Sequence, residues 1–253
     1  MTAGDFWHEI GWDVDIVDTA LVGKDHDAWS VAEHAACVVD GATPLEADWP
    51  NDLKPFSRAI AAALVGARAG GPVQGIWEDA IVALRAQFSP AGYRRSAGAA
   101  LVRATGTKLE FSTMGDVMCL VATDESTLLV LDPTLIELDR QAEFAGTRQA
   151  LIDNRRKANM PDGYAVFSDD PRASDKLTTL TVDASRVRAF ALLSDGAWRH
   201  LDPNPAVALE SLCHGNLREA FHGQVKRSGR ALADDATIIR FMLGDRGLAS
   251  IEA

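Results

Sequence analysis

The sequence predicts an α+β domain in which antiparallel sheet is covered by helices. Three observations support this class. The 253 residues are 47% apolar and 24% charged, as in a globular protein. Groups of short apolar runs alternate with segments of helical periodicity, and tight-turn signals separate the short runs. Because no linker-like stretch interrupts the chain, we expect one domain over residues 1–253.

The first half of the chain is predicted to supply a strand and then two helices. Residues 31–40, VAEHAACVVD, form a short run that ends in a β-branched pair, as strands do. Residues 56–68, FSRAIAAALVGAR, are rich in alanine and carry apolar residues at helical spacing. Residues 73–88, VQGIWEDAIVALRAQF, repeat that pattern.

The second half is predicted to begin with strands and to end with a strand. Residues 97–139 hold short apolar runs separated by Gly-Thr, Gly-Asp and Asp-Pro, which predicts an antiparallel meander. Helical composition returns at residues 140–157. A buried strand is expected within residues 186–198, a helix over 205–225, and a closing strand in ADDATIIRFML, residues 233–243.

Composition excludes several classes of function. The formal net charge of −11 disfavours nucleic acid as a partner, because phosphate backbones are bound by basic patches. No run of eighteen apolar residues and no basic leader occurs, so we expect a cytoplasmic protein without a membrane partner. Cys37, Cys119 and Cys213 are too far apart for a metal pair and are expected to be reduced thiols.

Aspartates recur at the ends of the apolar runs. They are Asp40 in CVVDG, Asp116 in FSTMGDVMCLV, Asp195 in FALLSDGAW, Asp234 and Asp235 in LADDATIIRF, with Asp25 and Asp27 ahead of the first strand. An Asp-Gly pair alone is a common hairpin-turn signal, so one such end would indicate only a turn. Because the pattern recurs, we expect these aspartates to act together at one site.

A cluster of divalent cations would explain the repetition. Carboxylates beside apolar strands are costly to desolvate and repel one another, and a cation removes both costs. Mg²⁺ and Mn²⁺ prefer oxygen ligands. Glycine after Asp40 and after Asp195 allows close backbone approach or a positive φ. No HExxH, Cys/His cluster, phosphate loop or nucleophile elbow is present.

The order of these motifs resembles the PP2C-type (PPM) family of metal-dependent serine/threonine phosphatases. KDHDAW, VVDGATP, STMGDVMCLV, FALLSDGAW and ADDATIIRF follow one another over residues 24–240. The resemblance implies a four-layer α-β-β-α sandwich with two central antiparallel sheets and metals at one end. It also implies two Mn²⁺ or Mg²⁺ ions and a third, looser one.

The resemblance assigns metal ligands by position: Asp27, Asp40, Gly41, Asp116, Asp195 and Asp234. Asp40 would bridge two ions, and the Gly41 carbonyl would bind the second. Asp195 and Asp234 would complete the first ion's sphere, and Asp116 would serve the third. Asp40 and Asp195 are thus the expected catalytic residues.

The sequence also departs from the family pattern. Val22 stands where the family has a phosphate-binding arginine, and Lys24 is the nearest substitute for binding substrate. Asp235 replaces a usual asparagine. His26 and His34 are the candidates for the proton donor to the leaving oxygen. Trp29 and Trp198 are expected to pack in the core beneath the site.

The expected function is removal of phosphate from phosphoserine or phosphothreonine of a protein by a metal-activated water. An alternative is a catalytically weak module that binds or senses a phosphorylated partner, and a third is a metal-free interaction protein. Residues 146–171 occupy the place where this family often inserts a flap, although an ordinary amphipathic helix also fits them.

Overall fold

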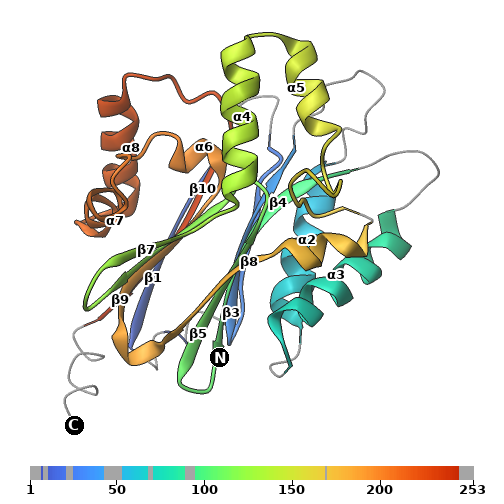
Figure 1. Cartoon of the computed structure of the whole chain (residues 1–253). Helices are drawn as coiled ribbons and strands as arrows, with labels where there is room; N and C mark the ends of the chain where they lie inside the picture. Colours follow the sequence, from blue (N-terminus) through green and yellow to red (C-terminus); the bar gives the residue numbers. More distant parts are fainter. Residues whose placement is uncertain are drawn as a thin grey trace.

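The structure, a computed structural model, describes residues 7, 11–20, 25–42, 53–67, 71–88, 95–168 and 170–244. Two five-stranded antiparallel sheets pack face to face (Figure 1). The first sheet contains, in spatial order, β1 (Trp12–Thr19), β10 (Ala236–Leu243), β9 (Val187–Leu193), β6 (Met118–Thr123) and β7 (Thr127–Val130). The second contains β2 (Ala28–Val31), β3 (Ala35–Gly41), β4 (Ala97–Thr105), β5 (Lys108–Met114) and β8 (Thr178–Asp183).

Helices cover the outer face of each sheet, so the predicted four-layer α-β-β-α sandwich is confirmed (Figure 1). The second sheet is covered by α2 (Leu53–Gly66) and α3 (Val73–Phe88), and the first by α7 (Pro205–Cys213) and α8 (Leu217–Ser228). At one end of the sheets lie α4 (Pro133–Ala145), α5 (Arg148–Arg155) and the short α6 (Asp195–Trp198). Two 3₁₀ turns, η1 (Pro171–Lys176) and η2 (Ala184–Arg186), flank β8.

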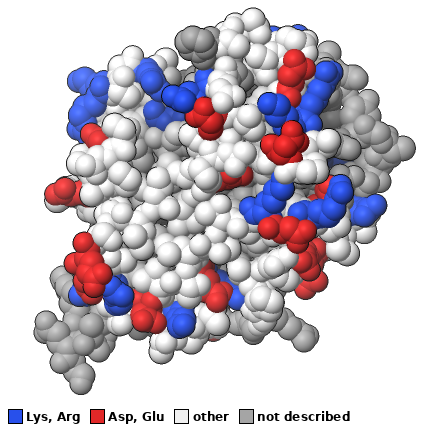
Figure 2. Space-filling view, in the orientation of Figure 1, with Lys and Arg blue, Asp and Glu red and all other residues white. Residues whose placement is uncertain are grey.

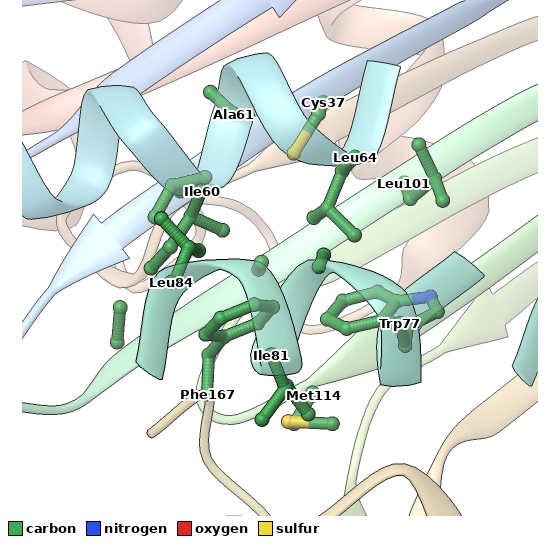
Figure 3. Close-up of a cluster of buried hydrophobic side chains, with 14 of the residues drawn as sticks. Cys37, Ile60, Ala61, Leu64, Trp77, Ile81, Leu84, Leu101, Met114 and Phe167 are labelled. Atoms are coloured by element: carbon green, nitrogen blue, oxygen red, sulfur yellow. The ribbon is translucent and has the colours of Figure 1, made fainter. Parts of the chain in front are cut away.

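Strand β3 shows why the central strands are apolar throughout. Ala36 and Val38 face the core between the two sheets, whereas Cys37 and Val39 face α2 and α3. Both faces of the strand are therefore buried, and period-2 alternation of apolar with polar residues disappears. Figure 3 shows Cys37 on the helix side among large apolar groups that include Trp77 and Phe167.

Two strand predictions need correction. Residues 31–40 hold the end of β2 and most of β3, joined by a tight turn in which Ala32 N–H donates to the Ala35 carbonyl at 2.8 Å. The predicted meander is two hairpins in different sheets, because β4 pairs with β5 in the second sheet and β6 with β7 in the first. The chain changes sheets at Gly115, whose φ of +86° is open to glycine at little cost.

Helix boundaries also differ from the prediction. Asp132-Pro133 begins α4 instead of forming a turn, because Asp132 Oδ1 accepts the Thr134 N–H at 2.8 Å as an N-cap. Gly146, with φ of +65°, separates α4 from α5. Residues 205–225 contain α7 and most of α8, separated by Gly215 at φ of +64°.

Strands β1 and β8 were not predicted, because their alternating acidic or threonine positions resemble surface loops. Cys37 and Cys119 are buried free thiols, as expected, and Cys213 is half-buried. Within the described ranges, every helix is too short or too polar to span a bilayer.

Candidate metal centre

Asp40 and Asp195 meet where the two sheets end. Asp40 is the penultimate residue of β3 in the second sheet, and Asp195 directly follows β9 of the first sheet as the opening residue of α6. The Asp195 backbone N–H donates to Asp40 Oδ2 at 3.0 Å. Two motifs that are 155 residues apart in the chain are therefore in direct contact.

Asp116 lies beside the same pair. Gly98 of β4 is the register partner of Asp40, and Asp116 Oδ1 lies 3.0 Å from the position that a Cβ on Gly98 would occupy. Trp198 Nε1 donates to the Asp116 carbonyl at 2.6 Å, which ties the turn between the sheets to α6. The sheet-switching turn thus places its aspartate next to Asp40.

Electrostatics show that the predicted carboxylates share one environment. The pKa of Asp40 is raised well above its ordinary value, chiefly by burial and then by repulsion from Asp195, Asp27 and Asp116. Burial, Asp116 and Asp234 raise the pKa of Asp195 to about 7, although Arg199 opposes this rise.

The pKa of Asp27 is also raised. Burial raises its pKa to about 8, the nearby hydroxyls of Ser194 and Thr237 lower it, and Asp235 and Asp195 raise it. Its Oδ2 atom is buried and has no hydrogen-bond partner among the described residues. An unpartnered buried carboxylate oxygen is costly, so a ligand at this position would stabilise the fold.

The two Asp-Gly pairs are sites of close approach, and neither glycine has a positive φ. A Cβ on Gly41 would lie 2.7 Å from the His26 carbonyl oxygen and 2.8 Å from Ser57 Oγ. A Cβ on Gly196 would lie 1.9 Å from the Asp235 carbonyl oxygen. Glycine is required at both positions because a neighbouring chain segment leaves no room for a Cβ. The hairpin-turn interpretation is therefore wrong for both Asp-Gly pairs.

Asp235 and Lys54 hold the segment that carries Asp27. Asp235 Oδ2 accepts the backbone N–H groups of Asp25 at 2.8 Å and His26 at 2.6 Å. Lys54 Nζ, in the first turn of α2, contacts Asp25 Oδ1 at 2.6 Å and the Asp27 carbonyl oxygen. These contacts offset the strain of Asp25, whose φ is +119°. Sequence reasoning missed Lys54, because no motif marks it.

The remaining predicted site residues have different outcomes. Asp234 lies close enough to raise the pKa of Asp195, as stated above, and its Oδ1 accepts the Asp235 N–H at 3.0 Å. Lys24 and Val22 fall outside the described residues.

Of the two histidine candidates, only His26 lies at the site. His26 packs beside Gly41, and its buried Nδ1 has no hydrogen-bond partner in the described part of the chain. His34 lies in the turn before β3, about 20 Å of strand from Asp40 at roughly 3.3 Å per residue, so it is remote from the site.

Of the two tryptophans predicted beneath the site, only Trp198 lies there. Trp198 is half-buried, packs against the core and bonds to the Asp116 carbonyl, as expected for a residue beneath the site. Trp29 is 40% exposed and donates to Asp18 Oδ2 at 3.1 Å, so its predicted place in the core is wrong.

The donor set fits hard divalent cations. Every side-chain ligand predicted here offers carboxylate oxygen, and mutual repulsion raises the pKa values of Asp40 and Asp195. The buried Asp27 Oδ2, which has no hydrogen-bond partner among the described residues, is a second reason to expect a cation here. Among the described residues, however, no three His, Cys, Asp or Glu side chains stand close enough together, as placed here, to hold a metal ion. Small side-chain adjustments would therefore accompany binding.

Comparison with solved structures places the fold. No protein-family model and no curated protein sequence matches the chain. The Mycobacterium tuberculosis serine/threonine phosphatase PstP/Ppp matches with a TM-score of 0.62 and 15% identity, over 92% of this chain and 98% of that one. Staphylococcus aureus serine/threonine phosphatase Stp1 matches with a TM-score of 0.64 and 11% identity, over 91% and 94%.

The chain has the PP2C-type phosphatase fold. A further match, the catalytic domain of PstP in complex with two manganese ions, has a TM-score of 0.61, 17% identity and coverage of 92% and 99%. The match to PP2C-type structures extends over nine-tenths of this chain, which agrees with the span of the sequence motifs. Identities this low establish the fold, and the activity has to be argued from the site.

Proposed function

We propose that the protein is a Mn²⁺- or Mg²⁺-dependent phosphatase that removes phosphate from phosphoserine or phosphothreonine of a protein substrate. The observation that carries the proposal is the contact between Asp40 and Asp195 across the ends of the two sheets. The repulsion that these two share with Asp27 and Asp116 is what dications would relieve. The PP2C-type fold supports the same activity.

The chain's own residues would divide the work. Asp40 would be shared between two ions, with the Gly41 carbonyl, Asp195 and Asp234 as further ligands and Asp116 at a third, looser position. Bound ions supply a water of lowered pKa and neutralise phosphate charge. Asp27, buried beside Ser194, would orient an outer water. The bonds from the Asp25 and His26 N–H groups to Asp235 keep the Asp27 segment in place.

Thiol chemistry is disfavoured as an alternative route. Cys37 and Cys119 are fully buried in the apolar cores, and burial raises the pKa of both thiols far above the neutral range. Neither sulfur is a reactive thiolate at neutral pH, because the thiolate is the nucleophilic form. A direct attack by water is the better fit.

Surface charge bears on the partner. On the face drawn in Figure 2, Lys and Arg are interspersed with Asp and Glu, and the described residues form no extensive basic patch there. This arrangement, with the net charge of −11, favours a protein partner over nucleic acid. We place the protein in the cytoplasm, where phosphorylated protein substrates occur.

A second candidate is a catalytically weak module that binds a phosphorylated partner. It is favoured by Val22, which stands where the PP2C-type family has a phosphate-binding arginine, and by the departures of the Asp40 and Asp116 turns from the family pattern. Both candidates require binding at the carboxylate cluster, and only the phosphatase requires turnover.

Turnover therefore tests the proposal. We expect Mn²⁺-dependent hydrolysis of p-nitrophenyl phosphate and of a phosphoseryl peptide, abolished by EDTA and by Asp40→Asn. The matched control is Asp183→Asn at the far end of β8, where the side chain caps no backbone group. Metal binding without hydrolysis would favour the module, and hydrolysis that persists in Asp40→Asn would contradict the proposed site.

A further inference from the structure

Arg199 is a cation built into the edge of the carboxylate cluster. Its Nε lies 3.1 Å from Asp195 Oδ2, one helical turn away, and it lowers the pKa of Asp195. Lys54, the other lysine or arginine described above at the cluster, bonds to Asp25 and to the Asp27 carbonyl and so serves the backbone there. Arg199 by contrast pairs with a proposed metal ligand.

The guanidinium rests on an aromatic ring at the site. Arg199 Cζ lies over the Trp198 ring, 5.4 Å from its centroid. Trp198 in turn donates to the Asp116 carbonyl at 2.6 Å, so the ring on which the guanidinium rests is attached to the site. A cation over an indole face is held by the ring's quadrupole.

Part of Arg199 remains open to solvent. Its Nε is buried, yet 32% of the side chain is exposed. The exposed area therefore belongs to other atoms of the side chain. A planar guanidinium offers five N–H donors in a fork that matches phosphate oxygens in pairs. A ligand arriving from solvent at the cluster could therefore contact this side chain without unfolding the site.

A phosphate dianion needs such a cation here. Without metal, Asp27, Asp40, Asp116 and Asp195 repel an incoming anion, and a guanidinium at the edge of the cluster offsets this repulsion at short range. With metal bound, the guanidinium adds to the attraction that the ions exert on phosphate. Arginine is suited to the task because it stays charged at any working pH and binds phosphate in a bidentate manner.

We propose that Arg199 is the residue that binds the phosphate group of the substrate. This inference rests on the proposed function and extends it to the side chain that recognises the dianion. Without ligands, Arg199 neutralises Asp195. With Asp195 engaged as a metal ligand, the guanidinium turns to the phosphate oxygens while Trp198 keeps it at the site.

The test is titration of inorganic phosphate into the protein by calorimetry, with and without Mn²⁺, alongside steady-state hydrolysis. We expect Arg199→Ala to weaken phosphate binding about 10- to 100-fold, as for loss of charged hydrogen bonds, and to raise KM more than it lowers kcat. Arg199→Lys keeps the charge without the fork and should recover part of the affinity. Mn²⁺ affinity of Arg199→Ala should be unchanged or tighter, because a competing cation is removed from Asp195.

The matched control is Arg188→Ala. Arg188 pairs through Nε with Asp124 Oδ1 at 2.5 Å near the opposite end of β9, so its loss also removes an Arg-Asp pair. Phosphate affinity should be unchanged in this variant. If Arg199→Ala keeps wild-type phosphate affinity while its melting temperature falls, Arg199 is only a structural partner of Asp195 and the inference is wrong.

The two proposals fail separately. Arg199-dependent phosphate binding without hydrolysis would contradict the phosphatase and keep the role of Arg199. Hydrolysis with a phosphate affinity that does not depend on Arg199 would support the phosphatase and contradict the role of Arg199. Absence of phosphate binding to the wild-type protein in either condition would overturn the inference.

Discussion

Substitution of Gly196 by alanine should damage the metal centre directly. The added Cβ would lie 1.9 Å from the Asp235 carbonyl oxygen, whereas real contacts of this kind stay above 3.0 Å. The oxygen belongs to the backbone, so the segment carrying Asp234 and Asp235 must move by more than 1 Å relative to Asp195. Overpacking of this kind costs about 1–3 kcal/mol of folding free energy. In a domain of this size that lowers Tm by about 2–4 °C per kcal/mol.

The assay pairs thermal unfolding with Mn²⁺ titration, and Gly75→Ala is the control. Gly75 lies in the first turn of α3, and the nearest atom to its added Cβ is Pro72 Cγ, in ordinary contact at 4.0 Å. Alanine there should stabilise the protein by about 0.5–1 kcal/mol. Gly196→Ala should lose both stability and Mn²⁺ affinity. Wild-type Mn²⁺ affinity and Tm in Gly196→Ala would refute the close-approach reasoning.

The other predictions concern the carboxylates. The folded-state pKa values of Asp27, about 8, and Asp195, about 7, lie above the ordinary 3.8, so the metal-free protein binds extra protons and loses stability as pH rises from about 4 to 8. The Tm difference between Mn²⁺-loaded and EDTA-treated protein should accordingly be larger at pH 8 than at pH 5.5, and equal differences would argue against repulsion within the cluster. Asp235→Asn should lower activity and Tm only slightly, since an amide oxygen can still accept the two backbone N–H bonds. A severe loss of activity in this variant, together with normal rates in Asp234→Ala, would mean that Asp235 is the metal ligand. Asp195→Ala should abolish hydrolysis with a small change in metal-free Tm, because it removes one repelling carboxylate, and measurable turnover in this variant would exclude Asp195 as a catalytic residue.

The sequence predicted the helices beside the second sheet and the acidic strand ends because both are local patterns. Residues 73–88 were predicted as a helix and form α3 over that span. Asp40 and Asp195 were identified from short motifs, and the fold brings them into contact. Apolar periodicity and an aspartate at a strand end can both be read without knowing which strands are neighbours.

What escaped prediction depends on tertiary structure. The turn at Gly115 has the same local pattern as a hairpin, and only packing reveals that it joins two sheets. Asp132-Pro133 is compatible with a turn or an N-cap, and the next helical turn decides between them. Lys54 and Arg199 carry no motif, since their roles come from partners brought close by folding.

Anomalous diffraction at the manganese edge from crystals soaked in MnCl₂ would test the central claim most directly. The account predicts two manganese peaks that share the Asp40 carboxylate, with Asp195 among the ligands of one of them. Manganese bound only elsewhere, or no manganese at the junction of Asp40 and Asp195 under conditions that support phosphate release, would contradict it.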